Sequence, residues 1–247
     1  MSLFALSDLH LSLNCDKKMD IFNGWEGYVE RLQKNWNNVV KEEDTVVVNG
    51  DISWAMKLEE TREDFAFLNR LPGQKLLLKG NHDLWWSTMN KMENYIAENG
   101  FDRLKLIHNN AAPVGSVCVC GTRGWFFDDG TDKKVLLREA GRLQTSLDAA
   151  FKTGLEPVVF LHYPPLYDGQ VCHEIMEVLL QNHVRRCYYG HIHGRAAGKA
   201  IRAEYGGVQF RLVTCDSNGF CPVLIEPRKI EIFRLIICEK SVLDMAF

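Results

Sequence analysis

The chain of 247 residues lacks several features that mark particular classes of protein. Its eight cysteines form no C-x-x-C pair, so free, reduced thiols are the favoured interpretation. A formal net charge of -3 gives no basic bias toward nucleic acid or an anionic membrane. The N-terminus has no signal-peptide pattern, and no apolar run approaches the roughly 20 residues that span a bilayer. We therefore expect a soluble, cytoplasmic protein without a membrane or nucleic-acid partner.

The composition, 46% apolar and 25% charged, is that of an ordinary globular protein. We find no repeat, low-complexity tract or linker, and therefore predict one domain over residues 1–247. Strand-like apolar runs at 3–8, 44–51 and 75–81 alternate with helical stripes at 25–40, 58–71 and 85–96. This β-α-β-α-β-α order is typical of a parallel sheet covered by helices.

The second half of the sequence is less regular. It suggests strands near 116–125, 157–165 and 185–193, with helices over 136–151 and 175–180. The segment from Val208 onward reads as strand and turn without helical period, which predicts an antiparallel end to the fold.

Polar side chains follow the apolar runs, at the ends where an open α/β sheet binds ligands. The candidates are Asp8, His10, Asp51, Asn81, His82, Asp83, His162, His191 and His193. Carboxylate, imidazole and amide oxygen without thiolate suit manganese, iron or zinc. The set exceeds what one ion needs from the protein and suits two ions roughly 4 Å apart that share a carboxylate, and such a pair yields a bound hydroxide near neutral pH. A phosphate-bearing substrate is compatible with the acidic chain, because bound metal makes a site locally positive.

The pattern resembles the calcineurin-like metallophosphoesterase superfamily. The motifs D-x-H, G-D, G-N-H-[DE], H and G-H-x-H stand in order, as Asp8-Leu9-His10, Gly50-Asp51, Gly80-Asn81-His82-Asp83, His162 and Gly190-His191-Ile192-His193. The resemblance implies a four-layer α-β-β-α sandwich of two mixed sheets flanked by helices.

The resemblance also implies roles for the matched residues. One metal ion would be held by Asp8, His10, Asp51 and His193, and the other by Asp51, Asn81, His162 and His191. His82 would assist the leaving group while a metal-bound hydroxide attacks phosphorus, and Asp83 would orient the ring of His82. The implied cofactors are two metal ions, with manganese the first choice and iron or zinc the alternatives.

Some candidates have a second interpretation. Asp83 would also serve as the cap of a helix beginning near Leu84, and His162 taken alone would be an ordinary core histidine. An aromatic set could line a substrate pocket or simply pack in the core: Trp54, Trp85, Trp86, Trp125, Phe126 and Phe127. Arg123 could contact a phosphate oxygen or form a surface ion pair.

The stretch "GDISWAM" lacks the arginine expected after G-D in protein serine/threonine phosphatases, which argues against that branch. We expect a phosphodiesterase-type enzyme acting on a small phosphomonoester or phosphodiester, such as a nucleotide or cyclic nucleotide. The alternative is a catalytically silent scaffold with the same fold. The sequence leaves the natural substrate, the metals and the oligomeric state open.

Overall fold

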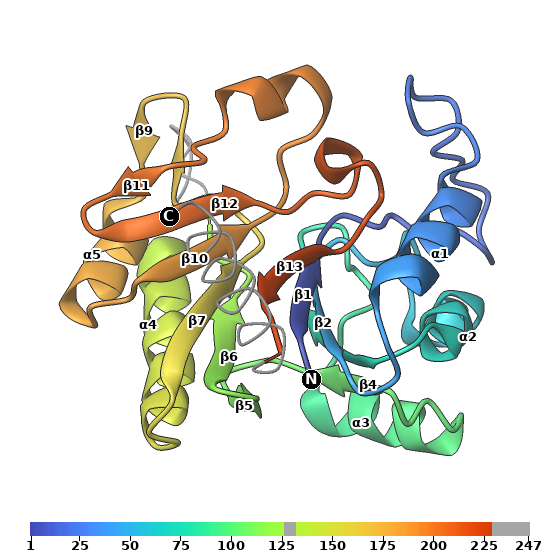
Figure 1. Cartoon of the computed structure of the whole chain (residues 1–247), viewed down its shortest axis with the longest axis horizontal. Helices are drawn as coiled ribbons and strands as arrows, with labels where there is room; N and C mark the ends of the chain where they lie inside the picture. The colour runs from blue at the N-terminus through green and yellow to red at the C-terminus, as the bar shows by residue number, and fades with distance from the viewer. Residues whose placement is uncertain (126–131, 229–247) are drawn as a thin grey trace, which may run out of the picture.

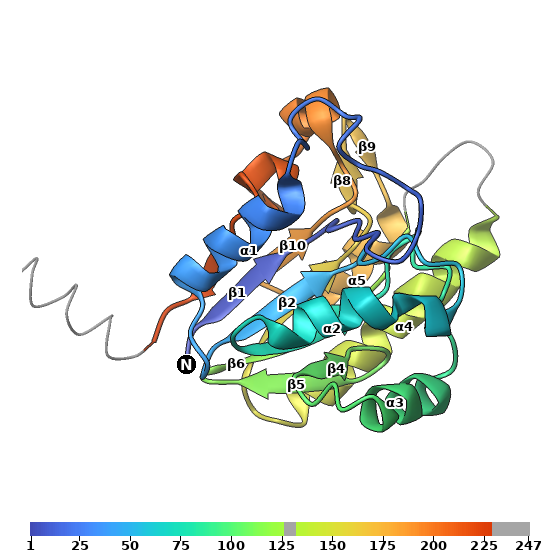
Figure 2. The ribbon, with the colours of Figure 1, turned by 90° about the vertical axis from the view of Figure 1, so that its right-hand side faces the viewer.

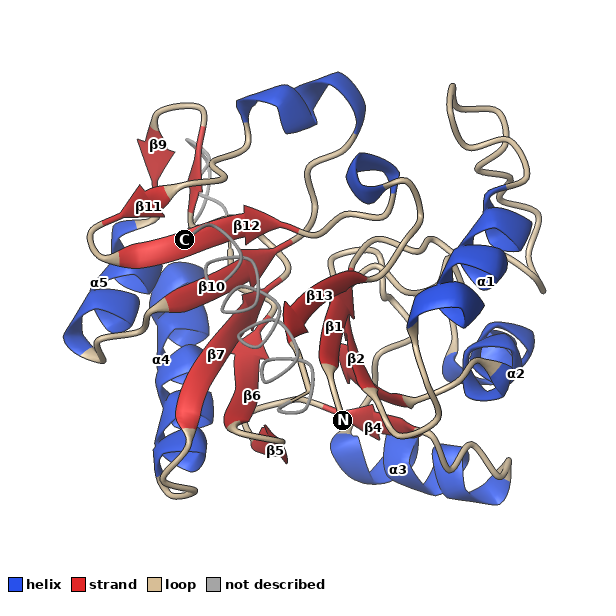
Figure 3. Ribbon diagram, in the orientation of Figure 1, coloured by secondary structure: helices blue, strands red, loops and turns tan. Residues whose placement is uncertain are grey.

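The computed structural model describes residues 1–125 and 132–228 and places two sheets between outer helices (Figures 1 and 3). The five-stranded sheet has the order β13-β1-β2-β3-β4. Its strands are β1 (Leu3–Leu6), β2 (Thr45–Asn49), β3 (Gln74–Leu78), β4 (Leu104–Leu106) and β13 (Val223–Glu226). Strands β1 to β4 are parallel, and β13 runs antiparallel to β1.

The six-stranded sheet has the order β11-β12-β10-β7-β6-β5. Its strands are β5 (Ala111–Val114), β6 (Val117–Thr122), β7 (Glu156–Leu161), β10 (Arg186–Tyr189), β11 (Glu204–Tyr205) and β12 (Val208–Leu212). A small hairpin pairs β8 (Leu166–Tyr167) with β9 (Gln170–Val171).

Helices cover the outer face of each sheet (Figures 1 and 2). The five-stranded sheet is covered by α1 (Tyr28–Val39), α2 (Arg62–Arg70) and α3 (Met89–Glu98), and the six-stranded sheet by α4 (Lys133–Phe151) and α5 (His173–Gln181). Three short 3₁₀ turns complete the described elements: η1 (Leu58–Thr61), η2 (Gly194–Lys199) and η3 (Asp216–Asn218). The predicted α-β-β-α sandwich of two mixed sheets is confirmed.

Side chains point alternately to the two faces along each strand. They form three apolar layers, one between each sheet and its helices and one between the two sheets. In β1, Phe4 and Leu6 pack toward the helices, whereas Leu3 and Ala5 pack against the other sheet. Both faces of this strand are buried, as expected for a central parallel strand. The register is therefore fixed on both sides, and the residues that follow each strand emerge at defined places.

Two local predictions are wrong. The tail is not wholly antiparallel, because β12 pairs in parallel with β10. The third helix begins at Met89 and is capped by Thr88, whose hydroxyl accepts from the backbone N–H of Lys91. The expected start near Leu84 is wrong, since Leu84 and Trp85 lie in a turn and Trp85 packs in the core, only 2% exposed.

The cysteines within the described residues are all free thiols, as predicted, while Cys238 lies outside them. None of the helices formed by residues 1–125 and 132–228 combines the length and apolarity needed to cross a bilayer.

Candidate metal centre

The predicted ligands come together at the carboxyl ends of the central strands of both sheets. Asp8 follows β1, Asp51 follows β2 and Asn81 follows β3. From the other sheet, His162 follows β7 and His191 follows β10. Parallel strands deliver their carboxyl ends to one edge, and two sheets packed face to face bring the ends of both within reach of each other. Backbone hydrogen bonds fix this edge, including Gly190 N–H to the carbonyl of His162 at 3.0 Å.

A first group consists of Asp8, His10 and His193, whose ligand atoms all lie within 4.8 Å of one another. Nε2 of His193 lies 2.9 Å from Oδ1 of Asp8 and 3.3 Å from Nε2 of His10. Two imidazole nitrogens that face each other at this distance beside a carboxylate require a cation or a proton between them.

A second group consists of Asp51, His162 and His191, within the same 4.8 Å limit. The amide of Asn81 joins it, because its Oδ1 lies 2.7 Å from Nε2 of His162 and 2.9 Å from Nδ1 of His191. This group therefore offers an amide oxygen, a carboxylate and two imidazoles, the set that hard and borderline metal ions accept.

Asp51 stands between the two groups. Its Oδ2 lies 3.4 Å from Nε2 of His162 in the second group and 3.8 Å from Nε2 of His10 in the first. Its Oδ1 accepts the backbone N–H of His82 at 2.8 Å, which holds the carboxylate plane in place. One oxygen is thus available to both groups.

The donors fit bound cations. Asp8 and Asp51 are 0% and 1% exposed, and two buried carboxylates are costly unless positive charge balances them. Nδ1 of His10 is buried without an acceptor among the described residues, and Nε2 faces the carboxylates of Asp8 and Asp51 at 4.0 and 3.8 Å. The two groups thus supply both ligand atoms and negative charge.

The protonation states respond to this excess of negative charge. Burial by itself lowers the pKa of a histidine. The charge of Asp51 nevertheless raises the pKa of His162 to about 9, and the charge of Asp8 raises the pKa of His193 to about 10. Burial lowers the pKa of His10 and of His191 to about 4. Burial raises the pKa of Asp8, but the charges of His193 and His162 outweigh this effect and hold the pKa well below its usual range. The directions of these shifts indicate that both groups attract positive charge, which a bound cation would supply.

Four of the seven expected ligands have left-handed backbone: Asp8 (φ 63), His10 (φ 47), Asp51 (φ 51) and His191 (φ 72). Aspartate and histidine tolerate this conformation better than bulkier residues, but it still costs about 1 kcal/mol or more at each position. Such a strained backbone persists where contacts with the surrounding structure hold it in place. Here it turns side chains at strand ends toward a common point.

Two motif glycines allow the close approach of these ends. A Cβ on Gly80 would lie 2.1 Å from the carboxylate and the backbone nitrogen of Asp51. A Cβ on Gly190 would lie 2.0 Å from Oγ of Ser7 and 2.5 Å from Oδ2 of Asp8. No side chain fits at either place, so the glycines in G-N-H and G-H-x-H are steric requirements of the ligand geometry.

Comparison with known proteins decides the family. A family model described as calcineurin-like phosphoesterase matches residues 1–195, a span that contains every predicted ligand. The chain belongs to this family. The resemblance seen in the five sequence motifs is thereby confirmed.

Relatives of this calcineurin-like phosphoesterase are distant. An uncharacterized protein of Methanocaldococcus jannaschii, MJ1445, is 31% identical over 113 residues, and the match spans 58% of that protein and 43% of this chain. Two solved structures share the fold. TT1561 of Thermus thermophilus has a TM-score of 0.54 at 14% identity, covering 92% of this chain and 98% of that one. A phosphopantetheinyl hydrolase from Mycobacterium tuberculosis has a TM-score of 0.53 at 15% identity, covering 92% and 96%.

Asp83 of this phosphoesterase does not orient His82 as expected. Its carboxylate is fully buried and accepts hydrogen bonds from the backbone N–H groups of Gly80 (2.7 Å), Asp51 (2.9 Å) and Ile52 (2.9 Å). The indole N–H of Trp85 also donates to it, at 3.1 Å. Burial and the charge of Asp51 raise the pKa of Asp83 to about 7, and the backbone donors act in the opposite direction. Asp83 also caps no helix at Leu84, since α3 begins later. It is a clamp that joins the G-D and G-N-H turns.

This clamp predicts a structural phenotype for Asp83→Asn. The amide group would direct two N–H donors at backbone N–H groups, so buried donors lose their acceptor. We expect the free energy of unfolding to fall by roughly 3 kcal/mol, as for one or two buried groups left unsatisfied, and metal binding to weaken. Urea denaturation and Mn²⁺ titration measure the two effects. A variant with unchanged stability and metal affinity would show that Asp83 does not hold these turns together.

Residues that the sequence pattern did not single out support the ligands from outside. Asp216 accepts the backbone N–H of Gly194 at 2.8 Å, and its other oxygen lies 3.4 Å from Nδ1 of His193. The carbonyl of Asn49 lies 3.1 Å from Nδ1 of His162. Partners of this kind fix the ring orientation of a ligating histidine. Asp216 follows β12 closely, and that strand-end position was the signal that could have found it.

The aromatic candidates separate in the structure. Trp54 stacks on His10, with ring centroids 4.8 Å apart, and borders the site. Trp85 packs in the core against Phe65, and Trp86 packs beside Trp85 and His108. Trp125 lies beside Tyr163, whereas Phe126 and Phe127 lie outside the described residues. Arg123 forms an ion pair with Glu139 at 3.6 Å.

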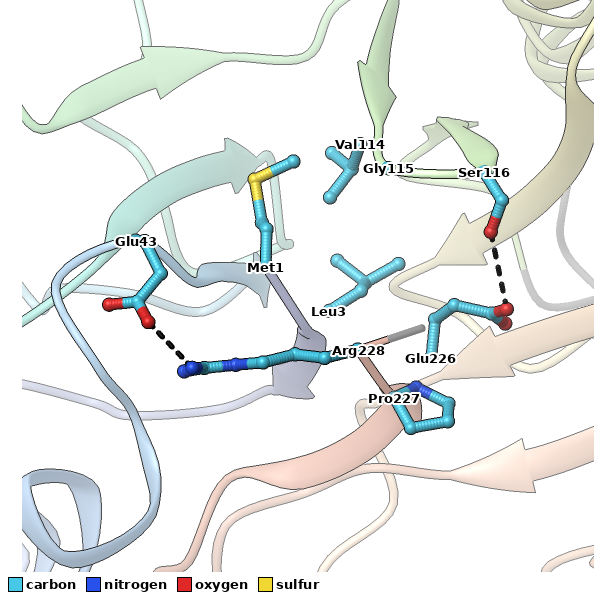
Figure 4. Close-up of a pocket in the computed structure, with 9 residues that line it drawn as sticks. All are labelled: Met1, Leu3, Glu43, Val114, Gly115, Ser116, Glu226, Pro227 and Arg228. Carbon is cyan, nitrogen blue, oxygen red and sulfur yellow. Dashed lines mark hydrogen bonds and ion pairs between the residues drawn. The ribbon is translucent and has the colours of Figure 1, made fainter. Parts of the chain in front are cut away.

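A pocket of ≈ 430 Å³ opens beside the first ligand group. Its walls combine Met19, Phe22, Trp25 and Trp54 with the rings of His10, His82 and His193. A different cavity, shown in Figure 4, lies between Met1, Glu43 and Arg228 near the amino ends of β1 and β2. The metal ligands follow the carboxyl ends of these strands. The ≈ 430 Å³ pocket therefore adjoins the metal centre, whereas the cavity in Figure 4 does not.

Proposed function

We propose that this protein is a binuclear metal-dependent phosphoesterase that hydrolyses a small phosphomonoester or phosphodiester. The observation that carries the proposal is the position of Asp51, whose Oδ2 faces both ligand groups at 3.4 and 3.8 Å. A single carboxylate oxygen between two complete donor sets is the arrangement that two ions need in order to share a ligand. The fold supports hydrolysis in general, since one solved structure that shares it is a phosphopantetheinyl hydrolase.

The first ion would be held by Asp8, His10, Asp51 and His193, and the second by Asp51, Asn81, His162 and His191. Two bound cations would neutralise phosphoryl oxygens and supply hydroxide near neutral pH. Manganese is our first choice, with iron and zinc as alternatives, because the donor set is oxygen and imidazole without thiolate. We also propose a cytoplasmic location.

His82 is the residue we assign to the leaving group. Its ring is held beside Trp54, with centroids 4.4 Å apart, and beside His10 at 5.6 Å. It is partly exposed and lines the ≈ 430 Å³ pocket together with His10 and His193. A ring in that place can donate a proton to a departing oxygen while it leaves the ligand positions to other residues.

The same pocket favours a substrate with an apolar or aromatic organic group. Trp25 is 5% exposed and Met19 is 9% exposed, so they form a firm wall, and Trp54 adds a ring face beside His82. A nucleoside or another flat group on the phosphoester would bury its faces against these side chains. We propose a nucleotide or cyclic nucleotide as the first substrates to examine.

Hydrolysis of p-nitrophenyl phosphate and bis(p-nitrophenyl) phosphate with added Mn²⁺ tests the proposal. We expect turnover of at least one ester, loss of activity with a chelator and recovery with Mn²⁺. The ratio of the two rates separates monoesterase from diesterase activity. Folded, metal-loaded protein that turns over neither ester nor any nucleotide would instead favour the catalytically silent scaffold.

The raised pKa values predict proton-linked metal binding. His162 (about 9) and His193 (about 10) carry protons at neutral pH in the metal-free protein, and each must lose its proton to become a ligand. As long as the pH stays below these pKa values, raising it therefore strengthens metal binding, by about tenfold per pH unit for each proton displaced. Mn²⁺ titration calorimetry between pH 6 and 8, in buffers of different ionisation enthalpy, should show about one proton released per ion. Affinity that is constant or falls with pH would contradict this charge balance.

A further inference from the structure

A second cavity near the metal centre is strongly cationic. It has a volume of ≈ 500 Å³ and lies between the start of α3, the side of α4 and the carboxyl ends of β3 and β6. Four cationic side chains line it: Lys79, Arg123, Arg138 and Arg142. This concentration is unusual in a chain whose net charge is -3.

One buried carboxylate, Glu139, offsets part of this charge. It is 1% exposed, pairs with Arg142 at 2.5 Å and lies 3.6 Å from Arg123. Among the ion pairs of residues 1–125 and 132–228, neither Lys79 nor Arg138 has a carboxylate partner. Four cationic side chains that face one space and share a single buried carboxylate repel one another. A bound anion would relieve that repulsion.

Two side chains that line the cavity carry buried hydrogen-bond donors without an acceptor in the described part of the chain. They are Nε of Arg123 and Nε1 of Trp86. Buried donors are normally satisfied, so each requires an explanation. Thr88, the N-cap of the ten-residue helix α3, and Ser87 add hydroxyl groups to the same wall. Hydroxyl groups and cations thus line one space, and Nε of Arg123 and Nε1 of Trp86 lie beneath its surface.

The cavity adjoins the metal centre but is separate from it. Lys79 directly precedes the Gly80-Asn81 turn, and the carbonyl of Arg123 accepts the backbone N–H of Tyr163 at 2.9 Å. The guanidinium of Arg123 lies 4.5 Å from the ring centroid of Trp125, which lies 5.4 Å from the ring of Tyr163. The ring of Tyr163 in turn lies 4.3 Å from that of His191. Trp125 and Tyr163 therefore connect Arg123, which lines the cavity, with His191 of the second ligand group.

We propose that this cavity binds a phosphate group other than the one that is hydrolysed. Planar guanidinium groups match the oxygens of a phosphate, and Lys79 supplies a point charge. The ligand is either a second phosphate of the substrate or a free phosphate compound. Only the first source rests on the proposed function, which it deepens by requiring a substrate with two phosphate groups.

Calorimetric titration with inorganic phosphate tests the proposal. The metal-loaded wild type should bind two phosphates per chain, one at the metal centre and one in the cavity. The double variant Lys79→Gln/Arg138→Gln should lose the second, with its affinity at least about tenfold weaker, equivalent to one charge-assisted hydrogen bond. The matched variant Lys41→Gln/Lys152→Gln removes the same charge from exposed sites outside the cavity and should behave as the wild type.

Asp51→Asn separates failure of this inference from failure of the proposed function. It removes the shared metal ligand yet should still bind one phosphate, in the cavity. The inference is overturned if Asp51→Asn binds none, or if the folded Lys79→Gln/Arg138→Gln variant binds phosphate as the wild type does. Circular dichroism checks that the double variant is folded.

Kinetics then identify the source of the phosphate. If it is part of the substrate, Lys79→Gln/Arg138→Gln should raise KM for a nucleoside bisphosphate at least about tenfold more than KM for the corresponding monophosphate. If it is a free ligand, the two KM values should shift alike while the second phosphate still binds to the wild type. Each result supports the cavity as an anion site and selects one source.

Discussion

Asp51→Asn is expected to abolish stable metal binding at both ligand groups and to lower kcat/KM by roughly 10³-fold or more, since a metal pair contributes several kcal/mol of transition-state stabilisation. The expectation follows from the position of Oδ2 between His162 and His10, at 3.4 and 3.8 Å. An amide offers one oxygen in place of two and carries no charge. Asp8, the one carboxylate left among the expected ligands, cannot attract two cations alone.

Metal analysis after dialysis, together with kinetics on p-nitrophenyl phosphate, measures this effect. Asp102→Asn, at an exposed position far along the chain from every ligand, removes the same charge and is expected to change neither quantity. An Asp51→Asn protein that keeps two ions with the affinity of the wild type would show that Asp51 is not shared.

His82→Ala is expected to keep both ions and to lower kcat by about 10²-fold, the usual scale for a lost general acid. Its ring makes contacts with Trp54 and His10, whereas its backbone N–H, which supports Asp51, survives the substitution. Binding should therefore persist while proton donation is lost. The defect should be smallest for p-nitrophenol, which leaves readily without a proton, and larger for an alkyl leaving group.

The matched control is His173→Ala, which removes an exposed histidine at the start of α5. It should leave kcat and the dependence on leaving group unchanged. Loss of one ion from His82→Ala would mean that this histidine is a ligand, and an equal defect for all leaving groups would mean that it does not act as an acid.

The ligand positions were predictable because each follows a recognisable apolar strand. Asp51 comes directly after the valine-rich run of β2, and His162 directly after β7. Once parallel order was inferred, these ends had to share an edge of the sheet. Local pattern and simple geometry therefore sufficed for the ligands, although the assignment of each to one metal rested on family resemblance.

Roles that depend on tertiary contacts were not predictable. Asp83 accepts from Asp51 and Ile52, about thirty residues earlier in the chain, and nothing in "GNHDLWW" reveals those partners. The sequence led us to pair Asp83 with the adjacent His82, whereas the buried carboxylate binds backbone N–H groups of Asp51 and Ile52. Asp216 acts on His193 from a turn after β12, a strand whose parallel pairing with β10 was also missed.

The cationic cavity shows the same limit. Lys79 stands far from Arg123, Arg138 and Arg142 along the chain, so no short sequence window displays all four cations together. The net charge of -3 conceals it as well. Local charge of this kind is a property of packing, and it appears only when the carboxyl ends of β3 and β6 are seen together.

The most direct test of the account is anomalous-scattering crystallography of the protein grown with Mn²⁺. We predict two manganese peaks per chain, one among Asp8, His10 and His193 and one among Asn81, His162 and His191, with the carboxylate of Asp51 between them. A single peak, or two peaks that Asp51 does not join, would contradict it.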